Sequence, residues 1–351
     1  MMNDIKLGKH VIGVNQPVFI IAEAGVNHNG DIDLAKTLIR ESKNAGANCI
    51  KFQTFKAERV VLNNTPKAEY QKLTTNPKES QFRMLKKLEL NEEAHKILFD
   101  YCQKTGITFL STPYNKKDVD FLNILGVDAF KLSSIHIVEP AFIEHVTGKG
   151  KPILMSTGMA TLAEVDEAVR TIRSISKYDQ CVLLQCTTNY PSLPEDANIK
   201  AMNTMKQAFD LHVGYSDHTQ SYTACIVAVA LGAKVIEKHF TLDRNLDGPD
   251  HSSSETPESF KQLVKIIREA EKTIGNGIKE PVNIEIQNAK GIRRSIVAAK
   301  KFCKGEVITK DSIEFKRPAN GISPKFENQL IGRKLRKDVE MNSLIDWNCI
   351  E

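Results

Sequence analysis

The sequence predicts an α/β protein in which a parallel (β/α)8 barrel of the TIM type is followed by a small β-rich domain. Three observations predict this fold. One unit recurs along the chain, an amphipathic helix, a glycine and a short apolar strand, as in DLAKTLIRESKNAGANCIKFQT. Several of the strands end at a charged or polar side chain, which is how a barrel builds a catalytic mouth. The 351 residues are also enough for a barrel of about 250 residues and a second domain.

Eight strands are expected in the first part of the chain. Their apolar runs show little alternation, as is typical of strands buried on both faces. Helices alternate with them up to about residue 274, and several end at a glycine, which adopts the left-handed conformation of a C-cap. The strands are placed near residues 17–23, 48–53, 107–112, 128–133, 152–157, 181–187, 211–215 and 234–239. A doubly wound open sheet is the competing architecture, but it concentrates its site at one switch point rather than at nearly every strand end.

Three segments complete the prediction. Residues 56–90 form a long insertion after the second strand, partly helical, which we expect to fold over the mouth of the barrel. The helix in ESFKQLVKIIREAEKTIGNG closes the barrel and ends at Gly275. We therefore assign residues 1–276 to the barrel, 277–291 to a polar linker and 292–351 to the small domain, where short strands alternate with turn signals.

Composition excludes several classes of protein. The 48 lysines and arginines exceed the 43 acidic residues by five, too few to indicate binding to nucleic acid. The seven cysteines are an odd number without a CxxC pair, which favours a reducing compartment. The N-terminus has no apolar signal core and no run approaches membrane-spanning length. We expect a cytoplasmic protein that does not enter a membrane.

Two histidines are candidate metal ligands. His218 in YSDHT and His239 in VIEKHF each follow a late strand and have a carboxylate beside them, Asp217 and Glu237. Neutral imidazoles suit Mn²⁺, Zn²⁺ or Fe²⁺, and carboxylate and water ligands favour Mn²⁺ or Mg²⁺. Such a metal polarises a carbonyl oxygen. Two alternatives remain open: a histidine buried for structural reasons, and a general acid or base.

Lys51 and Lys131 lie inside otherwise apolar strands, where an ammonium group is costly unless it is paired or faces a ligand. Two lysines in a barrel mouth suit a substrate that carries phosphate and carboxylate. Hydroxyl groups at strand ends would add neutral donors to an anion cradle. They are Ser111, Thr112, Ser133, Ser134, Ser156, Thr157, Thr187 and Thr188.

Two carboxylates are further candidates. Glu23 ends the first strand and would orient a sugar hydroxyl or act as a base; an ion pair with Lys51 is the structural alternative. Asp250 follows the last strand in the loop DGPD and would enter the mouth as a group that binds a hydroxyl.

Many motifs in series resemble the bacterial sialic acid (nonulosonic acid) synthase family over essentially the whole chain. They are IAEAGVNHNG, IKFQTF, FLSTPY, STGMA, CTTNYP, GYSDHT, VALGAKVIEKHFTLD, GPDHSSS and KRPANG. The resemblance implies a β/α barrel joined to an antifreeze-like (SAF) domain. It also implies an enzyme that condenses phosphoenolpyruvate, an N-acetylated mannosamine-type sugar and water into a nine-carbon 2-keto acid and phosphate.

The resemblance further implies the role of each site residue. His218 and His239 would bind a divalent metal, commonly Mn²⁺, with Mg²⁺ or Co²⁺ as alternatives. Arg317 would reach the N-acetyl group of the sugar across a domain-swapped homodimer. Phosphoenolpyruvate would be held by Lys51, Thr112, Lys131, Ser134 and Ser156, with Tyr190 nearby. The sugar and the reacting centre would be faced by Glu23, Gln53, Glu237 and Asp250.

Two departures from the family pattern affect the site. Thr188 stands where neuraminic acid synthases have an asparagine, and Ile135 and His136 replace a Gly-Glu or Gly-Asp pair. The insertion is more similar to that of legionaminic acid synthases. Two acceptors therefore remain open: N-acetylmannosamine, which gives N-acetylneuraminate, and 2,4-diacetamido-2,4,6-trideoxymannose, which gives N,N'-diacetyllegionaminate. A metal-dependent sugar isomerase or aldolase leaves the two lysines unexplained, and a non-catalytic carbohydrate-binding protein is a more distant alternative.

Overall fold

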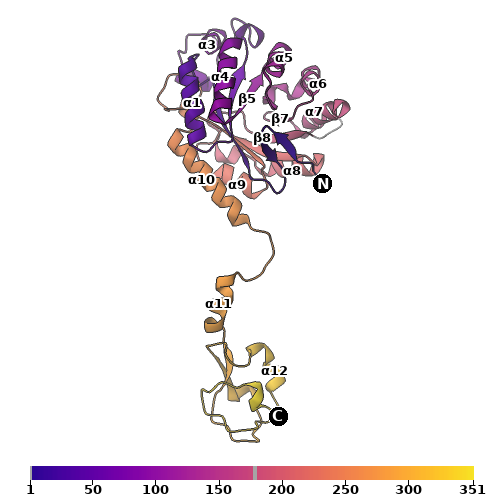
Figure 1. The fold of residues 1–351 in the computed structure, drawn as a ribbon, viewed down its shortest axis with the longest axis vertical. Helices are drawn as coiled ribbons and strands as arrows, with labels where there is room; N and C mark the ends of the chain where they lie inside the picture. The colour runs from indigo at the N-terminus through magenta and orange to yellow at the C-terminus, as the bar shows by residue number, and fades with distance from the viewer. Residues whose placement is uncertain (1, 177–179) are drawn as a thin grey trace. The chain divides into compact units, whose positions relative to one another are not determined.

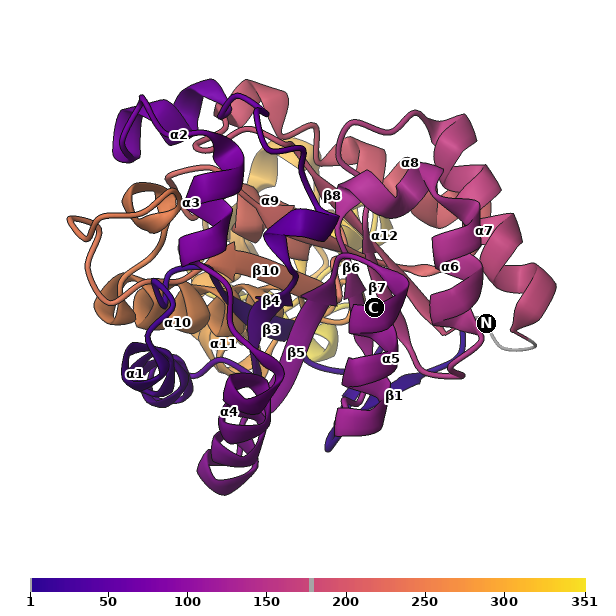
Figure 2. The same ribbon diagram turned by 90° about the horizontal axis from the view of Figure 1, so that it is seen from above.

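The computed structural model describes residues 2–176 and 180–351, and the chain divides into two compact units, Met1–Gly275 and Asn276–Glu351. The first unit is built around eight parallel strands, which confirms the predicted fold class (Figures 1 and 2). The strands are β3 (Phe19–Gly25), β4 (Cys49–Thr54), β5 (Thr108–Pro113), β6 (Phe130–Leu132), β7 (Ile153–Ser156), β8 (Cys181–Cys186), β9 (His212–Asp217) and β10 (Val235–His239).

The strands pair in the order β5-β4-β3-β10-β9-β8-β7-β6, and the two end strands, β5 and β6, lie side by side, so the sheet closes on itself. Helices surround it (Figure 2). They are α1 (Ile32–Asn44), α4 (Glu92–Thr105), α5 (Lys116–Leu125), α6 (Pro140–Thr147), α7 (Leu162–Ile175), α8 (Lys200–Phe209), α9 (Thr223–Ala230) and α10 (Pro257–Ile274). Gly275 caps α10, as the sequence predicts.

The side chains of each strand alternate between two buried layers. One layer packs between the sheet and the helices and includes Ile20, Ile50 and Ile236. The other fills the interior of the barrel near the amino ends of the strands, with Ile21 and Val235 among its members. Because both layers are apolar at this end, the strands read as continuous apolar runs.

A short antiparallel hairpin, β1 (Ile5–Leu7) and β2 (His10–Ile12), closes the amino end of the barrel. The buried side chains of Ile5, Leu7 and Ile12 belong to the interior apolar layer. This hairpin is not predictable from the sequence, since strands of three residues are too short to show a periodic pattern. With this end closed, the polar interior is reached from the carboxyl ends of the strands.

The insertion (residues 56–90) contains two helices, α2 (Glu69–Thr74) and α3 (Gln81–Lys87). Its Met84 and Leu88 pack with Val26 and Phe55 in a small apolar core of their own. Several of its side chains line the cavity described below, which confirms that the insertion folds over the mouth.

The second unit contains α11 (Asn283–Ile292), α12 (Glu327–Leu330) and the antiparallel pair β11 (Ser295–Ala298) and β12 (Ile313–Lys316). Four isolated bridges extend this β-rich pattern. The segment predicted as a linker, residues 277–291, includes most of α11, a helix that the sequence analysis did not expect. Within the described residues, no helix combines the length and the apolar character that crossing a bilayer requires.

Candidate active site

A cavity of about 670 Å³ opens at the carboxyl ends of the barrel strands. Thirteen of the site residues that the sequence predicts within the barrel line it. They are Glu23, Lys51, Gln53, Thr112, Lys131, Ser134, Ser156, Thr188, Tyr190, His218, Glu237, His239 and Asp250. Their positions follow from the strand period of two, because Glu23 follows the interior residue Ile21 at a spacing of two and Glu237 follows Val235 in the same way.

Four buried charges form a network at the centre of this cavity. The Nζ atom of Lys51 lies 2.7 Å from the carboxylate of Glu23 and 3.7 Å from that of Glu237. The Nζ atom of Lys131 lies 3.7 Å from the same oxygen of Glu237. All four side chains are at least 94% buried, so each charge depends on its partners for stabilisation. The ion pair between Glu23 and Lys51, the structural alternative raised from the sequence, is therefore present.

Burial and these partners set the protonation of the site. Burial raises the pKa of Glu23 to about 7 against the opposing charge of Lys51. Burial likewise raises the pKa of Asp250 to about 6. For Glu237, burial is outweighed by the two ammonium groups, and the pKa is lowered. For Lys51, burial is outweighed by the two carboxylates, and the pKa is raised, whereas burial lowers the pKa of Lys131. Near neutral pH, Glu23 is thus the carboxyl group of this network that exchanges a proton most readily.

Neutral hydrogen-bonding groups surround the two ammonium groups. Lys131 donates to Ser156 Oγ at 2.6 Å, and Lys51 donates to Thr112 Oγ1 at 3.2 Å. The backbone N–H of Gly158 donates to Ser134 Oγ at 2.9 Å. A methyl group on Gly158 would lie 2.5 Å from the hydroxyl of Thr188, so the close packing of these hydroxyls requires glycine at this position.

The two predicted metal ligands lie close together, with ring centroids 5.5 Å apart. The Nδ1 atom of His218 is 2.6 Å from the carbonyl oxygen of Thr187. A carbonyl accepts only, so Nδ1 carries the proton and Nε2 keeps a free lone pair. Burial lowers the pKa of both histidines, that of His239 strongly, so both imidazoles are neutral. Tyr190 packs against His218 at 4.1 Å between centroids.

This arrangement fits a divalent metal that takes its remaining ligands from substrate and water. The Nδ1 atom of His239 is buried without a hydrogen-bond partner in the described structure, and Asp250 Oδ2 lies 3.9 Å from it. Among the residues that the structure describes, no group of three His, Cys, Asp or Glu side chains is arranged to hold a metal. Catalytic metal sites keep a coordination position open for water or substrate, whereas structural sites are closed by protein ligands.

Some predicted groups lie elsewhere. Ser111 bonds to Thr54, Thr157 donates to a strand carbonyl and Thr187 donates to the carbonyl of residue 196; these three hydroxyls do not line the cavity. The predicted cradle is therefore smaller than expected. Arg317 belongs to the second unit, where it precedes a cis proline.

The cavity also contains residues that the sequence analysis missed. Tyr114 donates to Gln53 at 3.2 Å, and Gln53 donates to Glu23 at 3.3 Å, so this tyrosine fixes the amide that orients Glu23. Ser216 donates to Glu237 at 3.2 Å. Ser216 lies on β9, two residues before His218, and this spacing predicts that the two side chains face the same side.

Comparisons with known proteins show which families and structures this chain resembles. Residues 38–279 match the NeuB family and residues 293–351 match the SAF domain. The chain is 45% identical to an N,N'-diacetyllegionaminic acid synthase from Campylobacter jejuni, over 93% of this chain and 98% of that one. It is 43% identical to the synthase of the same name from Legionella pneumophila, over 97% and 96%. A crystal structure of N-acetylneuraminic acid (sialic acid) synthetase from Leptospira borgpetersenii, in complex with citrate, superposes with a TM-score of 0.73 at 34% identity, over 82% of this chain and 95% of that one.

The protonation of Glu23 is directly measurable. Carbon-13 NMR of labelled glutamate carboxyls should show one group that titrates at about pH 7 and is absent in Glu23→Gln. In Lys51→Met the pKa of Glu23 should rise further, because the opposing charge is gone. Since the folded pKa exceeds the ordinary 4.5, the contribution of Glu23 to stability is complete below pH 4.5 and is lost as the pH rises through about 7. A midpoint in the ordinary carboxyl range would contradict this description.

Proposed function

The chain belongs to the NeuB family of nonulosonic acid synthases and is therefore an enzyme that condenses phosphoenolpyruvate with a sugar, and we propose that the sugar is an N-acetylated mannosamine-type aldose. N-acetylmannosamine, which gives N-acetylneuraminate, is the first candidate. The observation that carries the proposal is the burial of two lysines and two neutral histidines in one cavity.

Lys51 and Lys131 would bind phosphoenolpyruvate. Its three negative charges need ammonium groups and neutral donors that replace water. Burial lowers the pKa of Lys131, so a bound anion would favour its charged form. Ser156 and Thr112 already contact the two ammonium groups and would share the anion with them. Ser134, and Thr188 at the position usually taken by asparagine, would contribute further hydroxyls.

His218 and His239 would hold a divalent metal, which we propose to be Mn²⁺, with Mg²⁺ or Co²⁺ as alternatives, and the metal would polarise the aldehyde oxygen of the acceptor. The cavity would place C3 of phosphoenolpyruvate in line with that aldehyde carbon. Forming the C–C bond leaves positive charge at C2. Glu237, ionised beside both lysines, would stabilise this charge.

Glu23 would complete the reaction as the general base. Water adds at C2 and gives a proton to Glu23, whose pKa of about 7 suits proton transfer near neutral pH. The tetrahedral intermediate then loses phosphate by cleavage of the C2–O bond, while its remaining hydroxyl passes its proton to the departing phosphate and becomes the ketone. The proton on Glu23 would go to the former aldehyde oxygen, which becomes a hydroxyl group. Gln53 holds Glu23 in place, and Asp250 would accept a hydrogen bond from a sugar hydroxyl.

Release of phosphate from phosphoenolpyruvate tests this function. With Mn²⁺ and an acceptor sugar, the enzyme should release phosphate, and a chelator should stop the reaction reversibly. His239→Ala should lower turnover at least a thousandfold and weaken binding of Mn²⁺. His145→Ala, at a partly exposed histidine paired with Asp120, is the control and should behave as wild type. Full activity of His239→Ala would remove the metal assignment; no release with any acceptor would refute the synthase.

The insertion favours a second acceptor. Its Val60, Val61, Met84 and Leu85 form an apolar part of the cavity lining. A methyl group at C6 would be buried favourably against such a wall, whereas a hydroxyl at C6 would lose hydrogen bonds to water. This observation favours 2,4-diacetamido-2,4,6-trideoxymannose, and with it N,N'-diacetyllegionaminate as product.

The ratio of activities with the two acceptors tests whether these apolar side chains select the sugar. Val61→Thr should shift the ratio of kcat/KM values toward N-acetylmannosamine by about tenfold, the range expected for one methyl contact in a hydrophobic pocket. Leu62→Thr is the matched control, since Leu62 is 82% exposed and does not line the cavity. If both variants shift the ratio equally, or neither does, the apolar lining from the insertion does not select the acceptor.

We further propose a domain-swapped homodimer in which each small domain covers the partner's cavity. Two apolar side chains that line the cavity are exposed, Ile135 and Met159 at 41% and 67%. The α11 segment exposes Ile284, Ile286 and Ile292 by at least half. Residues 276–351 hold 15 basic and 10 acidic residues, so the whole net charge of +5 lies in the second unit. A positive cap suits a site for an anionic substrate.

Mixing two inactive variants tests the exchange. Arg317→Ala should raise KM for the sugar at least tenfold while the barrel stays folded, because Arg317 would contact the N-acetyl group. Heterodimers of Arg317→Ala with Lys131→Met should regain part of the activity, since one barrel then receives an intact cap. Heterodimers without any recovery would exclude the exchange, and a monomer at assay concentration would exclude the dimer.

A further inference from the structure

Lys238 is a buried charge that the proposed reaction does not use. It lies on β10 between Glu237 and His239 and is 1% exposed. Because the side chains of a strand alternate, its ammonium group points away from the cavity that its two neighbours line. A buried lysine outside the reacting centre needs another reason for its position.

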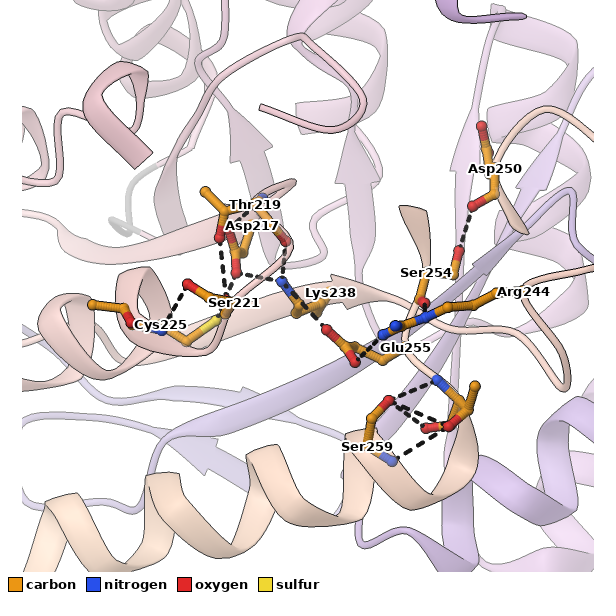
Figure 3. A network of polar contacts seen from close by, with 12 residues as sticks. Asp217, Thr219, Ser221, Cys225, Lys238, Arg244, Asp250, Ser254, Glu255 and Ser259 are labelled. Atoms are coloured by element: carbon orange, nitrogen blue, oxygen red, sulfur yellow. Dashed lines mark hydrogen bonds and ion pairs between the residues drawn. The ribbon is translucent and has the colours of Figure 1, made fainter. Parts of the chain in front are cut away.

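The contacts of Lys238 bracket His218. Its Nζ donates to Asp217 Oδ2 at 2.6 Å and to the carbonyl oxygen of Thr219 at 2.6 Å, the residues immediately before and after His218 (Figure 3). The other oxygen of Asp217 accepts from the N–H of Thr219 at 2.8 Å. The turn that carries His218 is therefore held at both ends by one side chain from β10.

The same side chain is linked to the segment that supports His239. Its Nζ lies 3.8 Å from Glu255 Oε1, and Arg244 pairs with the other oxygen of Glu255 at 2.8 Å. The N–H of Glu255 donates to the carbonyl oxygen of His239 at 2.8 Å. Figure 3 shows the contacts that run from Asp217 through Lys238 to Glu255 and Arg244. The backbones of both histidines are thus tied to Lys238.

We propose that Lys238 is a positioning residue that fixes His218 relative to His239 and so raises the affinity of the pair for a divalent metal. The inference rests on the proposed metal site. A metal held by two protein ligands depends strongly on their preset geometry, and charge-assisted hydrogen bonds in a buried site are short and stiff. Groups that orient metal ligands typically contribute 10- to 100-fold in metal affinity.

The competing explanation is that Lys238 and Asp217 form an ion pair that only stabilises the fold. The two explanations differ in the metal affinity that they predict once both charges are removed. Replacing a buried ion pair by neutral groups often leaves stability unchanged. The double variant Lys238→Met/Asp217→Asn removes both charges, and the asparagine oxygen still accepts from the N–H of Thr219. The bond within the turn is kept, whereas the bonds from the turn to β10 are lost, together with the bond that Cys225 donates to Asp217 Oδ2. A structural role then predicts normal metal binding, whereas a positioning role predicts weakened binding.

Binding of Mn²⁺ to the full-length protein, followed by the electron paramagnetic resonance of free Mn²⁺, decides between them. We expect the double variant to unfold at a temperature close to that of wild type and to bind Mn²⁺ 10- to 100-fold more weakly. Lys238→Met alone should show the same loss of affinity with lower stability, because Asp217 is left unpaired. Arg244→Met, in the same network but without contact to the turn at His218, should bind as wild type.

A folded double variant with wild-type affinity for Mn²⁺ would overturn the proposal, and so would an equal loss in Arg244→Met. If the double variant fails to fold, Lys238→Arg retains the charge but changes its geometry, and unchanged affinity in that variant would also overturn it. The control His239→Ala distinguishes an error in the role of Lys238 from an error in the metal site. If His239→Ala binds Mn²⁺ as tightly as wild type, the metal site itself is wrong.

Discussion

The charge network of Lys51, Lys131, Glu23 and Glu237 is the constraint on which the site depends. Four ionisable groups are buried at the end of a barrel whose other end is closed, and each is tolerated only because opposite charges lie within 4 Å. Their competition moves the pKa of Glu23 to about 7 while Glu237 stays ionised. Two similar carboxyl groups thereby differ in protonation: Glu23 exchanges a proton near neutral pH, and Glu237 stays ionised.

The barrel produces this network through the period of two in its strands. The same interior positions hold apolar residues at the amino end and reactive groups at the carboxyl end, as in the step from Val235 to Glu237. The outward positions pack against helices or, at Lys238, hold the backbone of the site. Stability and chemistry are thus divided between the two ends and the two faces of one sheet.

Much of this arrangement is predictable from sequence. The eight strands and the gathering of Glu23, Lys51 and His239 follow from polar residues at the ends of apolar runs. The prediction placed Ser111 and Thr157 wrongly because each is one residue away from an inward-facing neighbour, and a strand turns adjacent side chains to opposite faces. The β1–β2 hairpin was too short to show a pattern, and the partners of Lys238 and Tyr114 depend on tertiary contacts that no local pattern encodes.

The central claim is that a divalent metal and an enol phosphate meet in one cavity between the two histidines and the two lysines. Anomalous scattering from crystals of the enzyme soaked with Mn²⁺ and phosphoenolpyruvate measures this most directly. The account predicts one manganese peak within bonding distance of both His218 and His239, with the phosphate contacted by Lys51 or Lys131. A fully occupied manganese peak elsewhere, or phosphoenolpyruvate bound outside this cavity, would contradict it.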